Sequence, residues 1–128
     1  MNTSFPKKEK LKSKKLIEQL FAEGKSISAY PLKLVYLRTP FDTDAHIQVG
    51  VTVSKRNFKS AVKRNRIKRL LREGYRLNKH LVFNSLEGDY AFMFLYLGKE
   101  MPINHQLEKN VVQVFKKLLI KESNEKNN

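Results

Sequence analysis

The sequence predicts an α+β fold, a single-domain α/β sandwich in which one central sheet has helices packed on it. Three observations lead to this class. Strand-like segments alternate with segments of helical periodicity, one long helix has an apolar side, and one late segment is apolar throughout. The 128 residues, 41% of them hydrophobic, suffice for one domain with a core. The expected order is helix, strand, strand, helix, strand, helix.

The N-terminal part is expected to start with a flexible basic arm, residues 1–12, which has no apolar period. A short helix should follow over residues 13–23, because Ser13 is a suitable N-cap and Gly24 a suitable stop. Its apolar stripe consists of two pairs of residues four positions apart, Leu16 with Leu20 and Ile17 with Phe21.

Two strands are expected next. Residues 32–37 have the β-branched and aromatic side chains typical of a strand. Residues 47–54 alternate apolar and polar side chains, the period of a half-buried strand. The segment 39–45 between them contains Pro40, Asp42 and Asp44 and is typical of a turn. We therefore expect the two strands to pair as an antiparallel hairpin.

A long basic helix is expected from about residue 60 to residues 78–81. At about 100° per residue, one arc of this helix is apolar, and it comprises Ile67, Leu70, Leu71, Gly74, Leu77 and Leu81. Most of the opposite side is polar or basic, with Arg64, Asn65, Arg66, Lys68, Arg69, Arg72 and Arg76. Lys63 falls in the apolar sector, but in the first turn, where it can reach solvent. One side is thus expected to pack and the other to stay charged.

The last third of the chain should supply the centre of the sheet and a closing helix. Residues 89–97 are a continuous apolar run, as expected of a strand covered on both faces. The final helix should open near Pro102 and Asn104, and its apolar residues at helical spacing are Leu107, Val111, Val114, Phe115 and Leu118. Residues 121–128 are a polar tail expected to fray. Residues 13–120 thus form one domain, without an internal repeat.

Charge is concentrated in one segment. Between Lys55 and Lys79, eleven Lys or Arg residues accompany a single acid, Glu73, so this segment supplies +10 of the net +14. Such groups neutralise phosphates and release condensed counterions. A like-charge ladder at a spacing of four residues destabilises an isolated helix unless a polyanion completes it, and here it consists of Arg64, Lys68, Arg72 and Arg76. Nucleic-acid binding is favoured over a solvated helix face or an anionic membrane surface.

The context of the basic helix favours RNA over DNA. A helix that reads DNA usually follows another helix and enters the major groove. Here the helix follows a strand and a short basic loop, residues 55–59. A-form RNA has a narrow major groove, so such a helix would contact phosphates and shape.

Other features favour a cytoplasmic protein without a membrane segment. No apolar run reaches about 18 residues, and residues 1–15 do not resemble a secretory signal. The absence of cysteine fits a reducing compartment.

The basic loop and helix also resemble a known protein family. Residues 53–56, Val-Ser-Lys-Arg, followed by residues 61–72, resemble the signature of the bacterial ribonuclease P protein component family. The characteristic part is Arg64-Asn65-Arg66 followed by Ile67-Lys68-Arg69. The likeness covers roughly residues 8–120 and includes the length, the charge, the basic arm and both flanking helices. One departure is residues 58–60, Phe-Lys-Ser, where many members have a turn that contains glycine.

The resemblance implies a protein subunit of ribonuclease P, which helps a catalytic RNA subunit to remove the 5′ leader of precursor tRNA. The RNA-binding residues that it implies are Lys55, Arg56, Lys63, Arg64, Asn65, Arg66, Lys68, Arg69 and Arg72. It also implies a leader-binding cleft between the first helix and the sheet, with Ile17, Phe21 and either Val35 or Tyr36. Ile17 departs from the family's usual aromatic residue and stacks less well on a base.

Further implications concern the fold and the partners. The resemblance implies a left-handed crossover through the basic helix, opposite to the general preference of such connections. It also implies a monomeric free protein and Mg²⁺ bound mainly by the RNA, with no cofactor bound by the protein alone.

The residues themselves show no catalytic or metal-binding constellation. His46, His80 and His105 lack the spacing of metal ligands, and Asp42 and Asp44 fit a turn better than a metal site. Neither a nucleophile–base pair nor paired carboxylates stand out. We therefore expect no catalytic and no metal-ligating residues in this polypeptide.

Several alternatives stay open. Ile17, Phe21 and Tyr36 fit a plain core as well as a cleft. The alternating aromatic residues of 89–97 favour core packing over a base-stacking platform. For the whole protein, the alternatives are a basic structural RNA-binding protein, such as a small ribosomal component, and a DNA-binding regulator.

Overall fold

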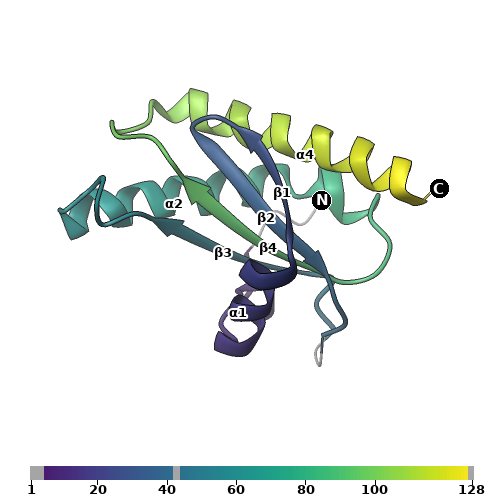
Figure 1. Ribbon diagram of the computed structural model, residues 1–128. Helices are drawn as coiled ribbons and strands as arrows, with labels where there is room; N and C mark the ends of the chain where they lie inside the picture. The colour runs from purple at the N-terminus through teal and green to yellow at the C-terminus, as the bar shows by residue number, and fades with distance from the viewer. Residues whose placement is uncertain (1–4, 42–43, 127–128) are drawn as a thin grey trace.

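The computed structural model describes residues 5–41 and 44–126. Their elements follow one another along the chain as shown in Figure 1. They are the 3₁₀ helix η1 (Lys7–Glu9), α1 (Lys14–Glu23), β1 (Lys25–Ala29), β2 (Leu32–Arg38), β3 (Ile47–Val53), α2 (Ala61–Asn78), α3 (His80–Phe83), β4 (Tyr90–Tyr96) and α4 (Asn104–Lys126). The predicted α+β class is confirmed. None of the described helices is long and apolar enough to cross a membrane.

The four strands form one sheet in the order β1-β2-β4-β3. β4 is antiparallel to β2 and parallel to β3, so the last strand in the sequence lies inside the sheet. The central place expected for residues 89–97 is confirmed, because six of the seven β4 residues are buried. The predicted hairpin of β2 and β3 is wrong, since β4 lies between them. The apolar strand β4 is buried best in the interior of the sheet, so it lies between β2 and β3 and keeps them apart.

Strand β1 is an element that the sequence analysis did not predict. Its five residues, Lys-Ser-Ile-Ser-Ala, pair antiparallel with β2 at the edge of the sheet. Only Ile27 and Ala29 are buried, while the other three residues of the strand are exposed. An edge strand with two inward side chains gives a weak periodic signal, which explains the omission.

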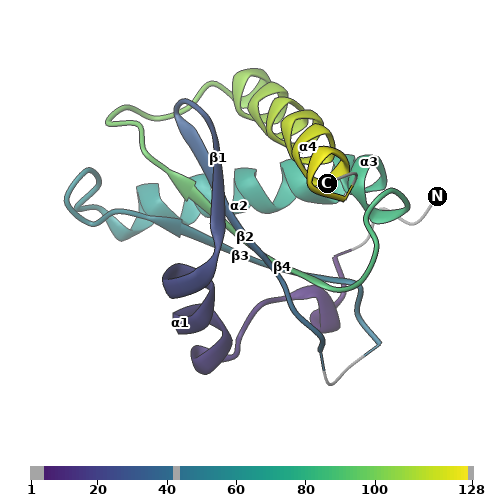
Figure 2. The same cartoon turned by 45° about the vertical axis from the view of Figure 1, so that its right-hand side comes forward.

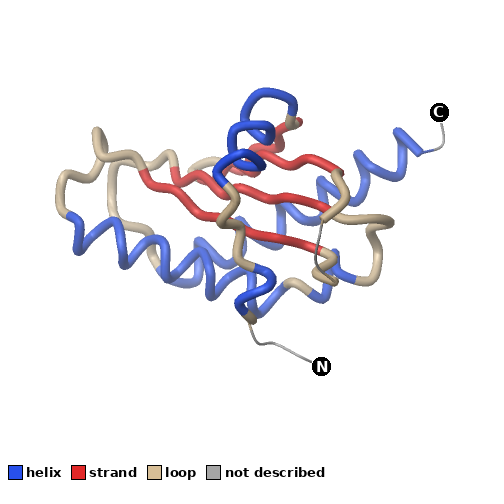
Figure 3. Tube along the Cα trace, turned by 90° about the horizontal axis from the view of Figure 1, so that it is seen from below, coloured by secondary structure: helices blue, strands red, loops and turns tan. Residues whose placement is uncertain are grey.

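The chain passes from β3 to its parallel neighbour β4 through α2. With β3 and β4 pointing to the left in Figure 1, α2 lies behind the sheet and the chain moves upward from β3 to β4. Figure 3 shows the same arrangement from below, with α1 on the opposite face. This connection is left-handed, as the resemblance implies and against the usual hand.

Two apolar clusters fill the two faces of the sheet. α2 and α4 cover one face and α1 covers part of the other, as Figure 2 shows. The side of α2 that packs consists of Ile67, Leu71, Gly74 and Tyr75. Tyr75 was not predicted, while Leu77, expected in the apolar arc, is 38% exposed. The apolar side of α2 therefore faces the sheet, but the buried arc is centred nearer to Tyr75 and farther from Leu77 than expected.

The N-terminal segment is packed rather than free from Phe5 on, which corrects the expected flexible arm. Leu11 N donates to Val49 O at 2.9 Å, which places the segment beside β3. Glu9 is 3% exposed, and its Oε1 accepts from Lys79 Nζ and from Tyr75 Oη, both at 3.1 Å. The flexible arm was inferred from lysines alone, and the buried acid among them anchors the segment.

The polar tail also differs from expectation, because α4 continues to Lys126. The Glu122 carboxylate accepts hydrogen bonds from the hydroxyls of Tyr36 and Tyr90. Lys121 Nζ lies 5.8 Å from the centroid of the Tyr36 ring. These contacts hold the last turns of the helix on the sheet.

Candidate nucleic-acid interface

The basic loop before α2 is held in place by core and backbone contacts. Phe58 is 6% exposed, and its ring centroid lies 6.0 Å from that of Tyr96. Arg64 Nη1 donates to Phe58 O at 2.7 Å and to Lys59 O at 3.0 Å. At residues 58–60, where the resemblance led us to expect a turn with glycine, this chain has a buried aromatic anchor. The Arg64 guanidinium shapes the loop that presents Lys55 and Arg56, both of which are exposed.

The start of α2 is set by Ser60, whose Oγ accepts from Lys63 N at 3.3 Å. From this cap the helix presents a stripe of exposed side chains that recur every three or four positions. Four residues on this stripe line a shallow hollow on the surface of the helix: Val62, Asn65, Arg66 and Arg69. Val62 is 80% exposed, so an apolar side chain lies among the cations. We call these four residues the α2 stripe.

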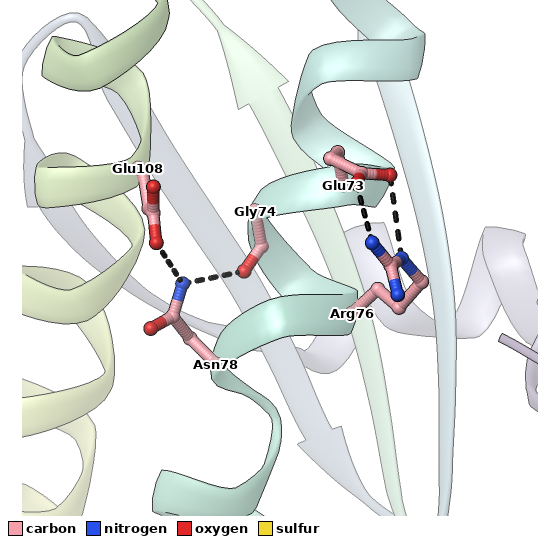
Figure 4. A network of polar contacts seen from close by, with 5 residues as sticks. All are labelled: Glu73, Gly74, Arg76, Asn78 and Glu108. Atoms are coloured by element: carbon pink, nitrogen blue, oxygen red, sulfur yellow. Dashed lines mark hydrogen bonds and ion pairs between the residues drawn. The ribbon is translucent and has the colours of Figure 1, made fainter. Parts of the chain in front are cut away.

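Farther along the helix, one cation is neutralised. Arg76 Nε donates to Glu73 Oε2 at 3.3 Å, and the two form an ion pair (Figure 4). The hydrogen bond from Arg76 lowers the pKa of the Glu73 carboxyl. Glu73 is the single acid of the basic segment. Arg69 at the end of the α2 stripe also lowers this pKa, but the hydrogen-bonded partner of the acid is Arg76, outside the stripe.

The C-terminal end of α2 is tied to α4. Asn78 Nδ2 donates to Gly74 O at 2.8 Å and to Glu108 Oε1 at 3.4 Å (Figure 4). The contact with α4 thus fixes the orientation of α2 and of its basic side.

The predicted cleft residues lie in different environments. Val35 faces α1 but is 8% exposed, because Leu20 and α1 cover it. Tyr36 faces the α2 and α4 side and is 2% exposed. Successive strand residues point to opposite faces, so Tyr36 cannot line a cleft beside α1, and that alternative was wrong. Ile17 is half-buried next to the sheet, and Phe21 is 50% exposed on α1.

A hollow of about 260 Å³ lies on the α1 face beside β3. Its lining includes Ile17, Lys10 and Lys12 from the N-terminal part, Gly50 and Met93 from the sheet, and Arg72 from α2. We call it the α1 hollow. A Cβ at Gly50 would lie 2.8 Å from Met93 Cε, so glycine leaves room here. Gly50 could have been found from the period-2 pattern of β3, whereas the lysines were assigned to a free arm.

Arg72 connects the two candidate surfaces. It follows the α2 stripe by one turn beyond Arg69 and lines the α1 hollow together with Lys12. The N-terminal segment bridges the edge of β3 at Lys10 and Val49, so it lies between α2 on one face of the sheet and α1 on the other. Cations of α2 and of the N-terminal segment thus meet at the α1 hollow, where Arg72 lies with Lys10 and Lys12.

No group of three or more His, Asp or Glu side chains that could hold a metal ion occurs in the described part of the chain. Asp44 Oδ2 accepts from Lys8 Nζ at 3.2 Å, while Asp42 lies outside the described residues.

Comparison with known proteins decides the family. The sequence model described as Ribonuclease P matches residues 5–119. The chain belongs to the ribonuclease P protein family. A ribonuclease P protein component of Porphyromonas gingivalis is 36% identical over 115 residues, which is 84% of both chains. That of Chlorobium phaeobacteroides is 45% identical over 83 residues, 62% of this chain and 57% of the other. The predicted family is confirmed, and with it the function as a ribonuclease P protein component.

Solved structures of ribonuclease P proteins share the fold. That from Thermotoga maritima superposes with a TM-score of 0.69 at 20% identity and covers 85% of this chain and 96% of its own. That from Staphylococcus aureus gives 0.67 at 19% identity and covers 84% and 93%. The ribonuclease P arrangement of one sheet and its packed helices is therefore present here.

Proposed function

We propose that this ribonuclease P protein binds the catalytic RNA subunit through the α2 stripe and the basic loop, and holds the 5′ leader of precursor tRNA in the α1 hollow. The observation that carries the proposal is that Arg72, on the same helix as the α2 stripe, also lines the α1 hollow. In this proposal the protein acts in the cytoplasm and is monomeric until it meets RNA.

The residues act by electrostatics and shape. Arg66 and Arg69 neutralise phosphates of the folded RNA, while Asn65 adds hydrogen bonds and Val62 excludes water between them. Arg64 acts indirectly, since its guanidinium holds the loop carbonyls. Ile17 and Met93 give the leader an apolar floor, and Lys12 and Arg72 attract its phosphates.

The chemistry is assigned to the RNA subunit. Hydrolysis of a phosphodiester needs an activated water and stabilisation of a charged transition state, which Mg²⁺ bound to RNA can supply. The protein reduces the repulsion between RNA phosphates, so less Mg²⁺ is needed to assemble enzyme and substrate.

The test is cleavage of a precursor tRNA by the catalytic RNA at low Mg²⁺, with and without the protein. We expect cleavage at the 5′ end of the mature tRNA only when the protein is added. Arg66→Gln/Arg69→Gln should remove this gain, and Lys116→Gln, an exposed lysine of α4, should keep it. No gain over RNA alone would instead favour a structural RNA-binding protein.

A further inference from the structure

A hollow of about 370 Å³ is lined by residues of the β1–β2 turn, of the loop between β4 and α4, and of α4. Figure 1 shows this turn and this loop at the same end of the molecule. This volume falls in the range of small-ligand sites. Tyr30 and Ile103 form part of its wall, with side chains 72% and 75% exposed, and Met101 adds to its apolar lining. We call this hollow the end pocket. Neither the α2 stripe nor the α1 hollow shares a residue with it.

One polar side chain in the end pocket lacks a partner. Asn110 lines the pocket and is 3% exposed. Its Oδ1 is buried without a hydrogen-bond partner among the residues that the structure describes. Buried polar atoms are normally paired. The two ends of an amide exchange places when the group rotates, so a ligand in the pocket could satisfy this side chain.

The basic loop lies against the same end of the molecule. Asn57 Nδ2 lies 3.5 Å from both Leu97 O and Gly98 O, and Leu97 N donates to Pro31 O at 2.7 Å. These bonds bring the loop that carries Lys55 and Arg56 next to the pocket wall. Lys99 and Glu100 line the pocket as well, and the cations available to a phosphate are Lys99 and those of the basic loop. The surroundings therefore suit a ligand that has an apolar ring and a phosphate.

We propose that the end pocket binds an unpaired adenine nucleotide of an RNA strand. The base stacks on Tyr30, as bases do on exposed aromatic rings of RNA-binding proteins. The Asn110 Oδ1 accepts from the adenine N6 amino group, a donor that uracil lacks. The phosphates lie toward Lys99 and the basic loop. This inference rests on the proposed function, since RNA is the partner, and adds a third contact that distinguishes bases.

The test uses the full chain, isotope-labelled for NMR, and three probes. These are adenosine 5′-monophosphate, uridine 5′-monophosphate and inorganic phosphate. We expect the adenine nucleotide to shift the amide signals of Tyr30, Gly98 and Met101, the uracil nucleotide to shift them less, and phosphate to affect only the basic loop. Identical shifts from phosphate and both nucleotides, or no shift around Tyr30, would overturn the proposal.

Matched variants separate stacking from recognition. Tyr30→Ala should weaken adenosine monophosphate binding about 5-fold or more, while Tyr30→Phe keeps the ring and the affinity. Asn110→Leu should abolish the preference for adenine over uracil while the melting temperature stays at or above that of the parent. Ile120→Ala, an equally exposed apolar residue elsewhere on α4, should change neither. If Asn110→Leu does not fold, the comparison of Tyr30→Ala with Tyr30→Phe still tests whether the nucleotide binds in the end pocket.

The result is independent of the test of the proposed function. The nucleotide titration contains no catalytic RNA, so failure of assembly through the α2 stripe leaves it intact. Conversely, an end pocket that binds no nucleotide leaves the cleavage assay and the Arg66→Gln/Arg69→Gln effect unchanged.

Discussion

At the scale of single residues, Arg64 and Arg66 have different tasks although they flank the same asparagine. Arg64 donates to two loop carbonyls, whereas Arg66 is exposed on the α2 stripe. Arg64→Gln should therefore lower both RNA affinity and stability, the latter by about 1 kcal/mol. Arg66→Gln should lower RNA affinity alone. Urea unfolding and RNA binding measured on the same samples check this, and equal stability of both variants would contradict it.

The buried pair of Glu9 and Lys79 yields a second prediction. Their side chains are 4% and 7% exposed, so neither charge can be hydrated once its partner is removed. Lys79→Met should cost about 3–5 kcal/mol of unfolding free energy, because it leaves the Glu9 carboxylate unpaired. Glu9→Gln in the same chain should restore a large part of this loss. Chemical unfolding of the two single variants and the double variant measures the coupling.

Tyr75 makes the protein sensitive to alkali. Burial raises the pKa of its hydroxyl above the ordinary value of about 10, and the nearby Glu9 carboxylate raises it further. Below pH 10 both folded and unfolded chains keep this proton, so its contribution to stability is complete. Above that value only the unfolded chain releases the proton, and stability falls as the pH rises.

Tyr75→Phe should therefore lose less stability than the parent between pH 7 and about pH 10.5. At pH 7 the variant itself should be less stable by about 1–3 kcal/mol, since Glu9 loses a donor. Unfolding curves at both pH values test the difference. Tyr30→Phe, at an exposed tyrosine, is the control and should follow the parent.

At the scale of elements, the first helix combines a packing residue with an exposed one. Phe21→Ala should raise the apparent substrate constant for precursor tRNA with no loss of stability, because its ring is 50% exposed. Ile17→Ala should raise this constant and also cost about 1 kcal/mol, since the side chain packs against the sheet. Neither should change affinity for the RNA subunit. Steady-state cleavage and RNA binding give the two quantities, and parallel losses in both would contradict separate surfaces.

The elements also show what the sequence could predict. α2 was predicted almost to the residue, because Ser60 caps it and its apolar and basic sides differ strongly. Strand β1 was missed because only Ile27 and Ala29 point inward. The pairing of β2 with β3 was wrong because strand patterns do not encode neighbours. β4 lies between them because its apolar side chains are best buried in the interior of the sheet, which depends on the sheet as a whole.

The candidate site was predictable where charge defines it and not where the fold creates it. The spacing of the arginines in the sequence was enough to place them on the charged side of α2. Gly50, Met93 and Lys12 come together only because the N-terminal segment runs beside β3. That course depends on Glu9, which lies among lysines and has its partner seventy positions away. The choice between Val35 and Tyr36 likewise needed the strand's orientation.

At the scale of the whole molecule, the net charge of +14 predicts a steep dependence of RNA affinity on salt. Each phosphate contact removed should reduce the slope of log affinity against log salt by roughly 0.7–0.9. Arg66→Gln/Arg69→Gln should therefore show a shallower slope than the parent. Lys109→Gln/Lys116→Gln, which lowers the net charge equally from exposed positions of α4, should retain the parent's slope. RNA titrations of both variants at several ionic strengths show whether the salt dependence comes from contacts of the α2 stripe or from the total charge.

The place of β4 has a consequence for the nascent chain. This strand is the last to leave the ribosome, yet it bridges β2 and β3. Until Tyr90–Tyr96 emerge, β1 and β2 can pair with each other, while β3 lacks the strand that joins it to them. The basic helix is made before the platform that supports it. The complete sheet can therefore form only after Tyr90–Tyr96 have been synthesised, and a polypeptide released before residue 90 has the basic helix without this sheet.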